Sequence, residues 1–187
     1  MASICVFCAS STGIDKSYLR LAAEVGARIG DGGHRLVSGG GRVSMMGEVA
    51  AAARAHGAAT LGVIPQHLVD YEVADTDSGE LLVVDTMRER KALMDAHAEA
   101  FLVLPGGIGT LEEFFEVWTA GSLGMHPKPV IVLDPDGFYT PLWSFIESMI
   151  ERGFVRLAAW QGLHRVASVE EAFALIEPAA LVRQPSS

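Results

Sequence analysis

Short apolar runs alternate with segments of helical periodicity along most of this chain, and that alternation constrains the fold more than any other feature. It predicts an α/β fold, a three-layer sandwich with a central, mostly parallel sheet flanked by helices. The expected strands are Ser3–Ala9, Arg35–Ser38, Ala59–Ile64, Leu81–Val84, Ala100–Leu104, Val130–Leu133 and Leu163–Val166. The expected helices include one carrying Tyr18, Leu21, Ala22, Val25 and Ile29, and then Met45–His56, Pro141–Arg152 and Val169–Ile176.

Length and charge narrow the class of protein. We expect the 187 residues to form one domain, 1–187, with Glu177–Ser187 as a mobile tail. The formal charge of −9 argues against a nucleic-acid partner, which would need a surface rich in Lys and Arg. No apolar run reaches the ~18 residues of a membrane helix, and no secretory signal is recognisable. A cytoplasmic protein without membrane association is the expectation.

The two cysteines, Cys5 and Cys8, form a C-x-x-C string that could indicate redox or metal chemistry. The string lies in the first expected strand, however, where residues three apart face opposite sides of the sheet, about 10 Å apart. We therefore expect two buried, reduced cysteines. The six histidines form no metal-ligand pattern with each other or with these cysteines, and we predict no metal site.

A glycine-rich turn follows the expected strand Ala100–Leu104, in the string Pro105-Gly106-Gly107-Ile108-Gly109-Thr110. A strand that turns sharply into a helix presents free backbone N–H groups and the positive end of the helix dipole, which attract phosphate. Glycines let a ligand approach the backbone closely. A second turn, Gly39-Gly40-Gly41, follows another apolar run. The two turns indicate a nucleotide or sugar-phosphate site.

Thr110 and Glu113 allow two interpretations. The spacing Thr-x-x-Glu at a helix start is that of a capping box, in which Thr110 bonds the N–H of Glu113 and the glutamate reaches back. Alternatively, Glu113 bonds a ligand hydroxyl or acts as an acid or base. The spacing by itself favours the capping box.

The segment Thr86–Lys91 opens a helix after the fourth expected strand. Met87, Arg90, Lys91 and Met94 then share one helix face. Arg and Lys there could hold a phosphate or carboxylate ligand. The alternative is ion pairing with Glu89, Asp95 or a more distant carboxylate, and the spacing does not decide between the two.

Other nucleotide sites fit poorly. The stretch from Gly39 to Gly47 lacks the G-x-G-x-x-G spacing of a nicotinamide dinucleotide site, and the chain contains no G-x-x-x-x-G-K-[ST] string for a P-loop. The acidic segment Pro65–Glu80 is long for a βα connection, so it is either a functional loop or a solvated insertion.

Taken together, these segments resemble the LOG family of cytokinin-activating phosphoribohydrolases, long misnamed lysine decarboxylases, and actinobacterial members in particular. The family signature P-G-G-x-G-T-x-x-E is present at Pro105–Glu113, and its companion M-x-x-R-K at Met87–Lys91. Further matches are Val6–Ser11, Gly39–Gly41 with Met46-Gly47, Gly62–Pro65 and Gly121–Pro129.

The resemblance implies a Rossmann-like fold, a homodimer and no cofactor. It implies hydrolysis of the N-glycosidic bond of cytokinin riboside 5′-monophosphates, and of AMP, to the free base and ribose 5-phosphate. The implied catalytic pair is Arg90 and Glu113. The implied substrate-binding residues are Gly40, Gly41, Glu72, Met87, Lys91, Gly107, Ile108, Gly109, Thr110, Leu111, Glu112 and Thr119.

The chain departs from the family pattern at a few turn positions. Many relatives read G-G-G-x-V-G-L-M-G where this chain has Arg42, Ser44 and Met45, and Ala9 replaces a common glycine. Extra bulk there could reshape the phosphate or base pocket. Two rival functions are less well supported than the hydrolase. One is a non-catalytic nucleotide sensor or carrier. The other is a pyridoxal-phosphate decarboxylase, but none of the three lysines, Lys16, Lys91 and Lys128, has an identifiable pyridinium partner.

Overall fold

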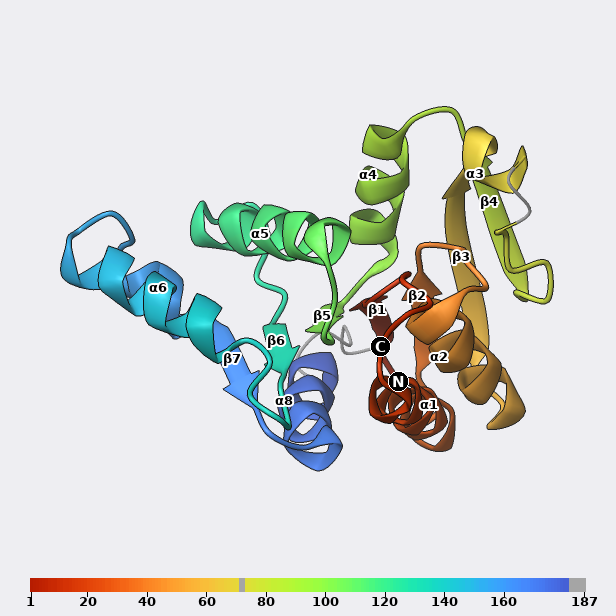
Figure 1. The fold of residues 1–187 in the computed structure, drawn as a ribbon, viewed down its shortest axis with the longest axis horizontal. Coiled ribbons are helices and arrows are strands. Elements are labelled where there is room, and N and C mark those ends of the chain that lie inside the picture. The colour runs from red at the N-terminus through yellow and green to blue at the C-terminus, as the bar shows by residue number, and fades with distance from the viewer. Residues whose placement is uncertain (71–72, 182–187) are drawn as a thin grey trace.

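The protein forms a parallel seven-stranded sheet covered by helices on both faces (Figure 1). This computed structural model describes residues 1–70 and 73–181. The strands are β1 (Ser3–Phe7), β2 (Arg35–Ser38), β3 (Ala59–Pro65), β4 (Glu80–Val84), β5 (Ala100–Val103), β6 (Val130–Leu133) and β7 (Leu163–Val166). The helices are α1 (Lys16–Asp31), α2 (Ser44–Ala55), α3 (Gln66–Asp70), α4 (Met87–His97), α5 (Ile108–Ser122), α6 (Thr140–Glu151), α7 (Leu157–Gln161) and α8 (Val169–Leu181).

All seven strands lie where the apolar runs predict them, within two residues at each end. The predicted three-layer α/β fold is thus confirmed. Two local expectations were incomplete. The segment Pro65–Glu80 contains the short helix α3, and α8 continues beyond Ile176 to Leu181. Within the described part of the chain, no helix is both long enough and apolar enough to span a membrane.

The strand order β4-β3-β2-β1-β5-β6-β7 creates a switch point at the centre of the sheet. The chain adds strands outward from β1 as far as β4, then returns to place β5 on the other side of β1. Ligands of open parallel sheets bind at such a point, outside the carboxyl ends of the strands. Here the residues that follow β1 and β5 remain paired, since Ala9 donates its N–H to the carbonyl of Pro105 at 3.2 Å.

Two apolar clusters fill the space between the sheet and its helices. Helices α1, α2 and α8 cover one face, and α4, α5 and α6 cover the other (Figure 1). Cys8 belongs to the first cluster and Cys5 to the second, so the two thiols lie on opposite sides of the sheet. Both are buried and free, as predicted, and burial raises the pKa of each thiol.

Candidate active site

The glycine turn after β5 leads directly into α5. Gly107 is the residue before the helix, and the first intrahelical hydrogen bond runs from Leu111 N–H to the Gly107 carbonyl. The preceding N–H groups of that turn have no acceptor within the helix. A Cβ at Gly106 would lie 2.1 Å from Oγ1 of Thr110, whereas Cβ atoms at Gly107 and Gly109 would meet open space. The start of α5 is therefore open to a ligand and electrostatically suited to an anion.

The predicted capping box at Thr110 and Glu113 is wrong. Because α5 begins at Ile108, Thr110 lies inside the first turn and Glu113 lies one turn further on, so neither can cap the helix. The capping box of this region belongs to α4. There Oγ1 of Thr86 accepts from the N–H of Glu89 at 3.1 Å, and the Glu89 carboxylate accepts from the N–H of Thr86 at 3.0 Å.

Glu113 instead forms a buried ion pair with Arg90. Nη1 of Arg90 donates to Oε1 of Glu113 at 2.7 Å, and Nε donates to the carbonyl of Val63 at 3.2 Å. The two residues are 8% and 9% exposed. Burial raises the pKa of Glu113, and the charge and hydrogen bond of Arg90 offset part of that rise. The pair links α4, α5 and β3 behind the glycine turn.

Gly39, at the end of β2, makes room for this pair. A Cβ at Gly39 would lie 1.7 Å from Nη2 of Arg90, so the guanidinium packs directly on the glycine backbone. The sequence predicts Gly39 as part of the second glycine turn but not among the individual substrate-binding residues. The signal was present in the run Gly39–Gly41, but only the packing shows which glycine faces Arg90.

Lys91 points along the outer face of α5. Its ammonium bonds the carboxylates of Glu112 and Glu116, the latter at 2.6 Å, and these hydrogen bonds raise the pKa of Lys91. The helix face Met87–Met94 thus forms ion pairs, one of the two alternatives that its spacing allowed, and its role in ligand binding stays a prediction. Both cations pair with carboxylates of α5. Met94 is buried in the core, and Met87 is exposed.

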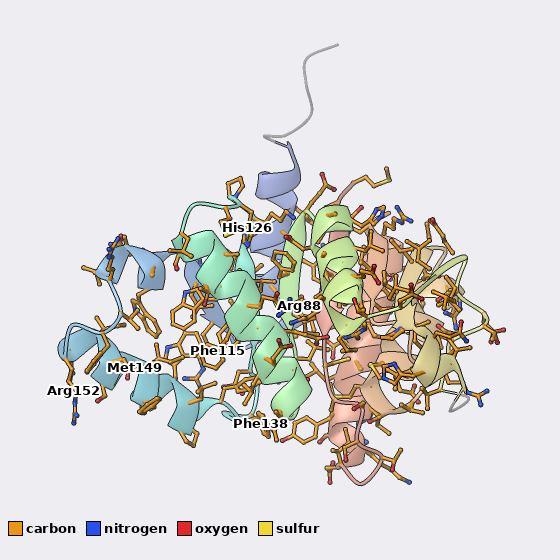
Figure 2. All side chains as sticks on the ribbon, turned by 90° about the horizontal axis from the view of Figure 1, so that it is seen from above. Arg88, Phe115, His126, Phe138, Met149 and Arg152 are labelled. Carbon is orange, nitrogen blue, oxygen red and sulfur yellow. The ribbon has the colours of Figure 1, made fainter. Side chains whose placement is uncertain are left out.

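A cavity of about 860 Å³ runs between α4 and α5 and reaches Glu113. Figure 2 shows the two helices side by side, with Arg88 near the gap between them and Phe115 on the side of α6. Lys91, Glu112 and Thr119 also line this cavity. Thr119 lies twelve residues after Gly107 along the helix, about 18 Å away, so it belongs to the far end of the cavity.

The second glycine turn is covered by the segment before β4. Asp75 donates its N–H to the carbonyl of Gly40, and Arg42 donates to the carbonyl of Val73, both at 2.8 Å. The carboxylate of Asp75 is buried and accepts from Arg54 at 2.7 Å. These hydrogen bonds hold the turn Gly39–Gly41 in place.

The remaining predicted residues are spread around these groups. Ile108 is exposed at the start of α5, and Leu111 packs at the edge of the core. Gly40 has a φ of +71°, which suits glycine, and Gly41 pairs with Ala74. Glu72 lies outside the described residues.

Comparison with known proteins agrees with this architecture and with the motifs. Residues 46–176 match the family described as "Possible lysine decarboxylase". The chain is 47% identical over 176 residues, 94% of each chain, to the cytokinin riboside 5′-monophosphate phosphoribohydrolase of Mycobacterium tuberculosis. It is 41% identical over 174 residues, 93% of this chain and 80% of the relative, to the Arabidopsis thaliana enzyme of that name, LOG1.

A solved structure shares the fold at low identity. The molybdenum cofactor carrier protein of Chlamydomonas reinhardtii superposes with a TM-score of 0.73 at 20% identity, covering 96% of this chain and 98% of the carrier. That likeness concerns the fold alone. The sequence relatives decide the family: the chain belongs to the LOG family of phosphoribohydrolases.

Proposed function

We propose that this protein hydrolyses the N-glycosidic bond of cytokinin riboside 5′-monophosphates, and of AMP, releasing the free base and ribose 5-phosphate. The observation that carries the proposal is the buried Arg90–Glu113 pair beside an open, glycine-lined helix start. The names of the relatives supply the substrate class.

The proposed mechanism begins with the phosphate. The N–H groups at the start of α5 hold the 5′-phosphate, and this remote contact orients the reacting bond. Cleavage of the bond between C1′ and the base nitrogen leaves positive charge on the ribose, which a carboxylate stabilises. Glu113 is the buried carboxylate on α5, the helix that begins at this turn.

Glu113 also takes the proton of the attacking water. The water oxygen bonds C1′, and the electron pair of the broken bond goes to the base. The base takes up a proton from solvent, to which Glu113 then releases its own. Arg90 positions the Glu113 carboxylate and favours its ionised form, because it bonds Oε1 and lowers a pKa that burial raises.

We further propose that the protein acts in the cytoplasm as a homodimer. Several large apolar side chains are exposed near the carboxyl end of α5 and the link from α6 to α7, among them Leu123 at 70% and Phe154 at 79%. Leu123 and Phe115 each line both the large cavity and a neighbouring one of about 570 Å³. An apolar surface of this kind is suited to a second copy. Light scattering of wild type and of Phe154→Asp tests the dimer.

The activity itself is tested by chromatography of products. Wild-type protein should release free base from isopentenyladenosine 5′-monophosphate and from AMP, and little from the matching nucleosides. Glu113→Gln should remove this activity, while Glu147→Gln, an exposed carboxylate on α6, should not. Binding of AMP without release of adenine would instead indicate a sensor or carrier.

A further inference from the structure

Ser44 has a backbone conformation that its side chain makes unfavourable. Among the residues that the structure describes, it is the one non-glycine residue with a positive φ, at 52°. It is also the first residue of α2. Left-handed backbone is costly for residues with a Cβ, and such strain persists only where the surrounding structure enforces it. The family pattern described above usually has glycine at this position, so this chain retains the backbone shape but adds a side chain.

The added hydroxyl makes a specific contact. Oγ of Ser44 donates to the carbonyl of Ser11 at 2.5 Å. Ser11 belongs to the connection between β1 and α1, which Ala9 ties to the glycine turn through the carbonyl of Pro105. The Ser44 hydroxyl therefore joins the start of α2 to the loop that borders the anion-binding turn.

A small apolar cavity lies next to this contact, and Ser11 is one of its lining residues. The cavity has a volume of about 210 Å³ and lies between Ser11, Met45, Phe138 and the backbone of Gly106 and Gly107. Figure 2 shows Phe138 close to one end of α5. Ala9 also lines it. Three positions at which this chain departs from the family pattern, Ala9, Ser44 and Met45, thus meet at one side of the glycine turn.

We propose that Ser44 is a positioning residue for nucleotide binding, whose hydroxyl holds the 9–14 loop against α2 and so keeps the wall beside the glycine turn in place. The role rests on the proposed function, because it assumes that the turn holds the nucleotide phosphate. Without the hydroxyl, the loop has to be ordered when the ligand binds, and that ordering weakens affinity. The Arg90–Glu113 pair lies on the other face of the sheet from α2, so the chemical step should not change.

Two substitutions separate this role from simple strain. Ser44→Gly removes the hydroxyl and relieves the backbone, so folding stability should be kept or increased. Ser44→Thr keeps the hydroxyl but places a β-branched side chain at positive φ, so stability should fall. If Ser44 has a purely structural role, the more stable Ser44→Gly should bind the nucleotide more tightly than Ser44→Thr. If Ser44 positions the loop, Ser44→Thr should bind more tightly although it is less stable.

The experiment measures KM and kcat with isopentenyladenosine 5′-monophosphate and the melting temperature of all three proteins. The Kd of AMP is measured by calorimetry with Glu113→Gln added to each of them, so that AMP is not hydrolysed during the titration. Ser44→Gly should raise Kd and KM about fivefold with kcat unchanged, the size expected for one hydrogen bond. Ser44→Thr should bind as wild type does. A glycine variant with wild-type affinity, or a threonine variant as weak as the glycine variant, would overturn the proposal.

The same measurements distinguish this proposal from the proposed function. If wild type binds AMP but releases no base, the hydrolase assignment fails, and the Kd series still decides the role of Ser44. If wild type binds no AMP, both fail.

Discussion

Nη2 of Arg90 occupies the space that a Cβ of Gly39 would need, only 1.7 Å from that position. The end of β2 therefore determines where the guanidinium on α4 lies, and the guanidinium in turn determines where the Glu113 carboxylate on α5 lies. These contacts join β2, α4 and α5, which are far apart in the sequence. The geometry of the active site depends on these contacts.

Gly39→Ala should displace the Arg90 guanidinium and lower kcat/KM by about tenfold or more, because the ion pair and the bond to Val63 cannot both survive. Steady-state kinetics on base release provide the measurement. Gly162→Ala is the matched control, since the nearest atom to its added Cβ is 4.0 Å away. Full activity in Gly39→Ala would show that the guanidinium position is unimportant.

Arg90 and Glu113 should be strongly coupled in stability. Arg90→Ala leaves a buried carboxylate without its partner, which typically costs about 3–5 kcal/mol. It should also lower kcat/KM by more than about tenfold. Adding Glu113→Gln to Arg90→Ala should restore part of the stability but none of the activity. Denaturant unfolding of both single variants and the double variant gives the coupling energy, and additive effects would contradict a buried pair.

The pH dependence of the reaction should reflect Glu113. Burial raises the pKa of this carboxyl above the ordinary glutamate value of about 4.3, and the proposed mechanism needs it ionised. The acidic limb of kcat/KM should therefore lie at higher pH than an ordinary glutamate would give. Removing the charge of Arg90 should move the limb to higher pH, whereas Arg90→Lys should move it less. If the acidic limb of kcat/KM lies at the same pH in the Arg90 variants as in wild type, the group that titrates is not Glu113.

The raised pKa of Glu113 should also make the folding stability depend on pH. The carboxyl proton of Glu113 is bound more tightly in the folded protein than in the unfolded chain. Protonated Glu113 therefore adds to the free energy of unfolding at low pH. This contribution is lost as the pH rises from the pKa of Glu113 in the unfolded chain to its pKa in the folded protein. The stability of wild type relative to Glu113→Gln should decrease over that window. Urea unfolding at a series of pH values measures it.

The capping box of α4 should contribute to stability. Thr86→Ala removes the hydroxyl that accepts from Glu89 N–H, and such caps are worth about 1 kcal/mol, or about 2–4 °C in melting temperature for a domain of this size. Thr76→Ala, at an exposed loop threonine, is the control. Equal melting temperatures for the two variants would contradict the cap.

Local patterns in the sequence were enough to predict the strands. Apolar runs such as Val130–Leu133 stop at polar or glycine residues, and the structure ends the strands there. The same local reasoning failed at Thr110. Thr86–Glu89 and Thr110–Glu113 have the same spacing, but only the first begins a helix, since the backbone already turns into α5 at Gly107.

The contacts that build the site are not local, which is why the sequence pattern alone left them undecided. Arg90 and Glu113 are 23 residues apart, and the carbonyl that Arg90 also bonds is on β3. Their pairing depends on β5 returning to the centre of the sheet, so that α4 and α5 lie side by side. The resemblance to a family names both residues as a catalytic pair, and the geometry adds their direct ion pair and the packing of Arg90 on Gly39.

The most direct test of the central claim is a crystal structure of Glu113→Gln with isopentenyladenosine 5′-monophosphate bound. We expect the phosphate on the N–H groups that open α5 and the ribose C1′ facing the side chain at position 113. A nucleotide whose phosphate lies elsewhere, or whose ribose faces away from that side chain, would contradict it.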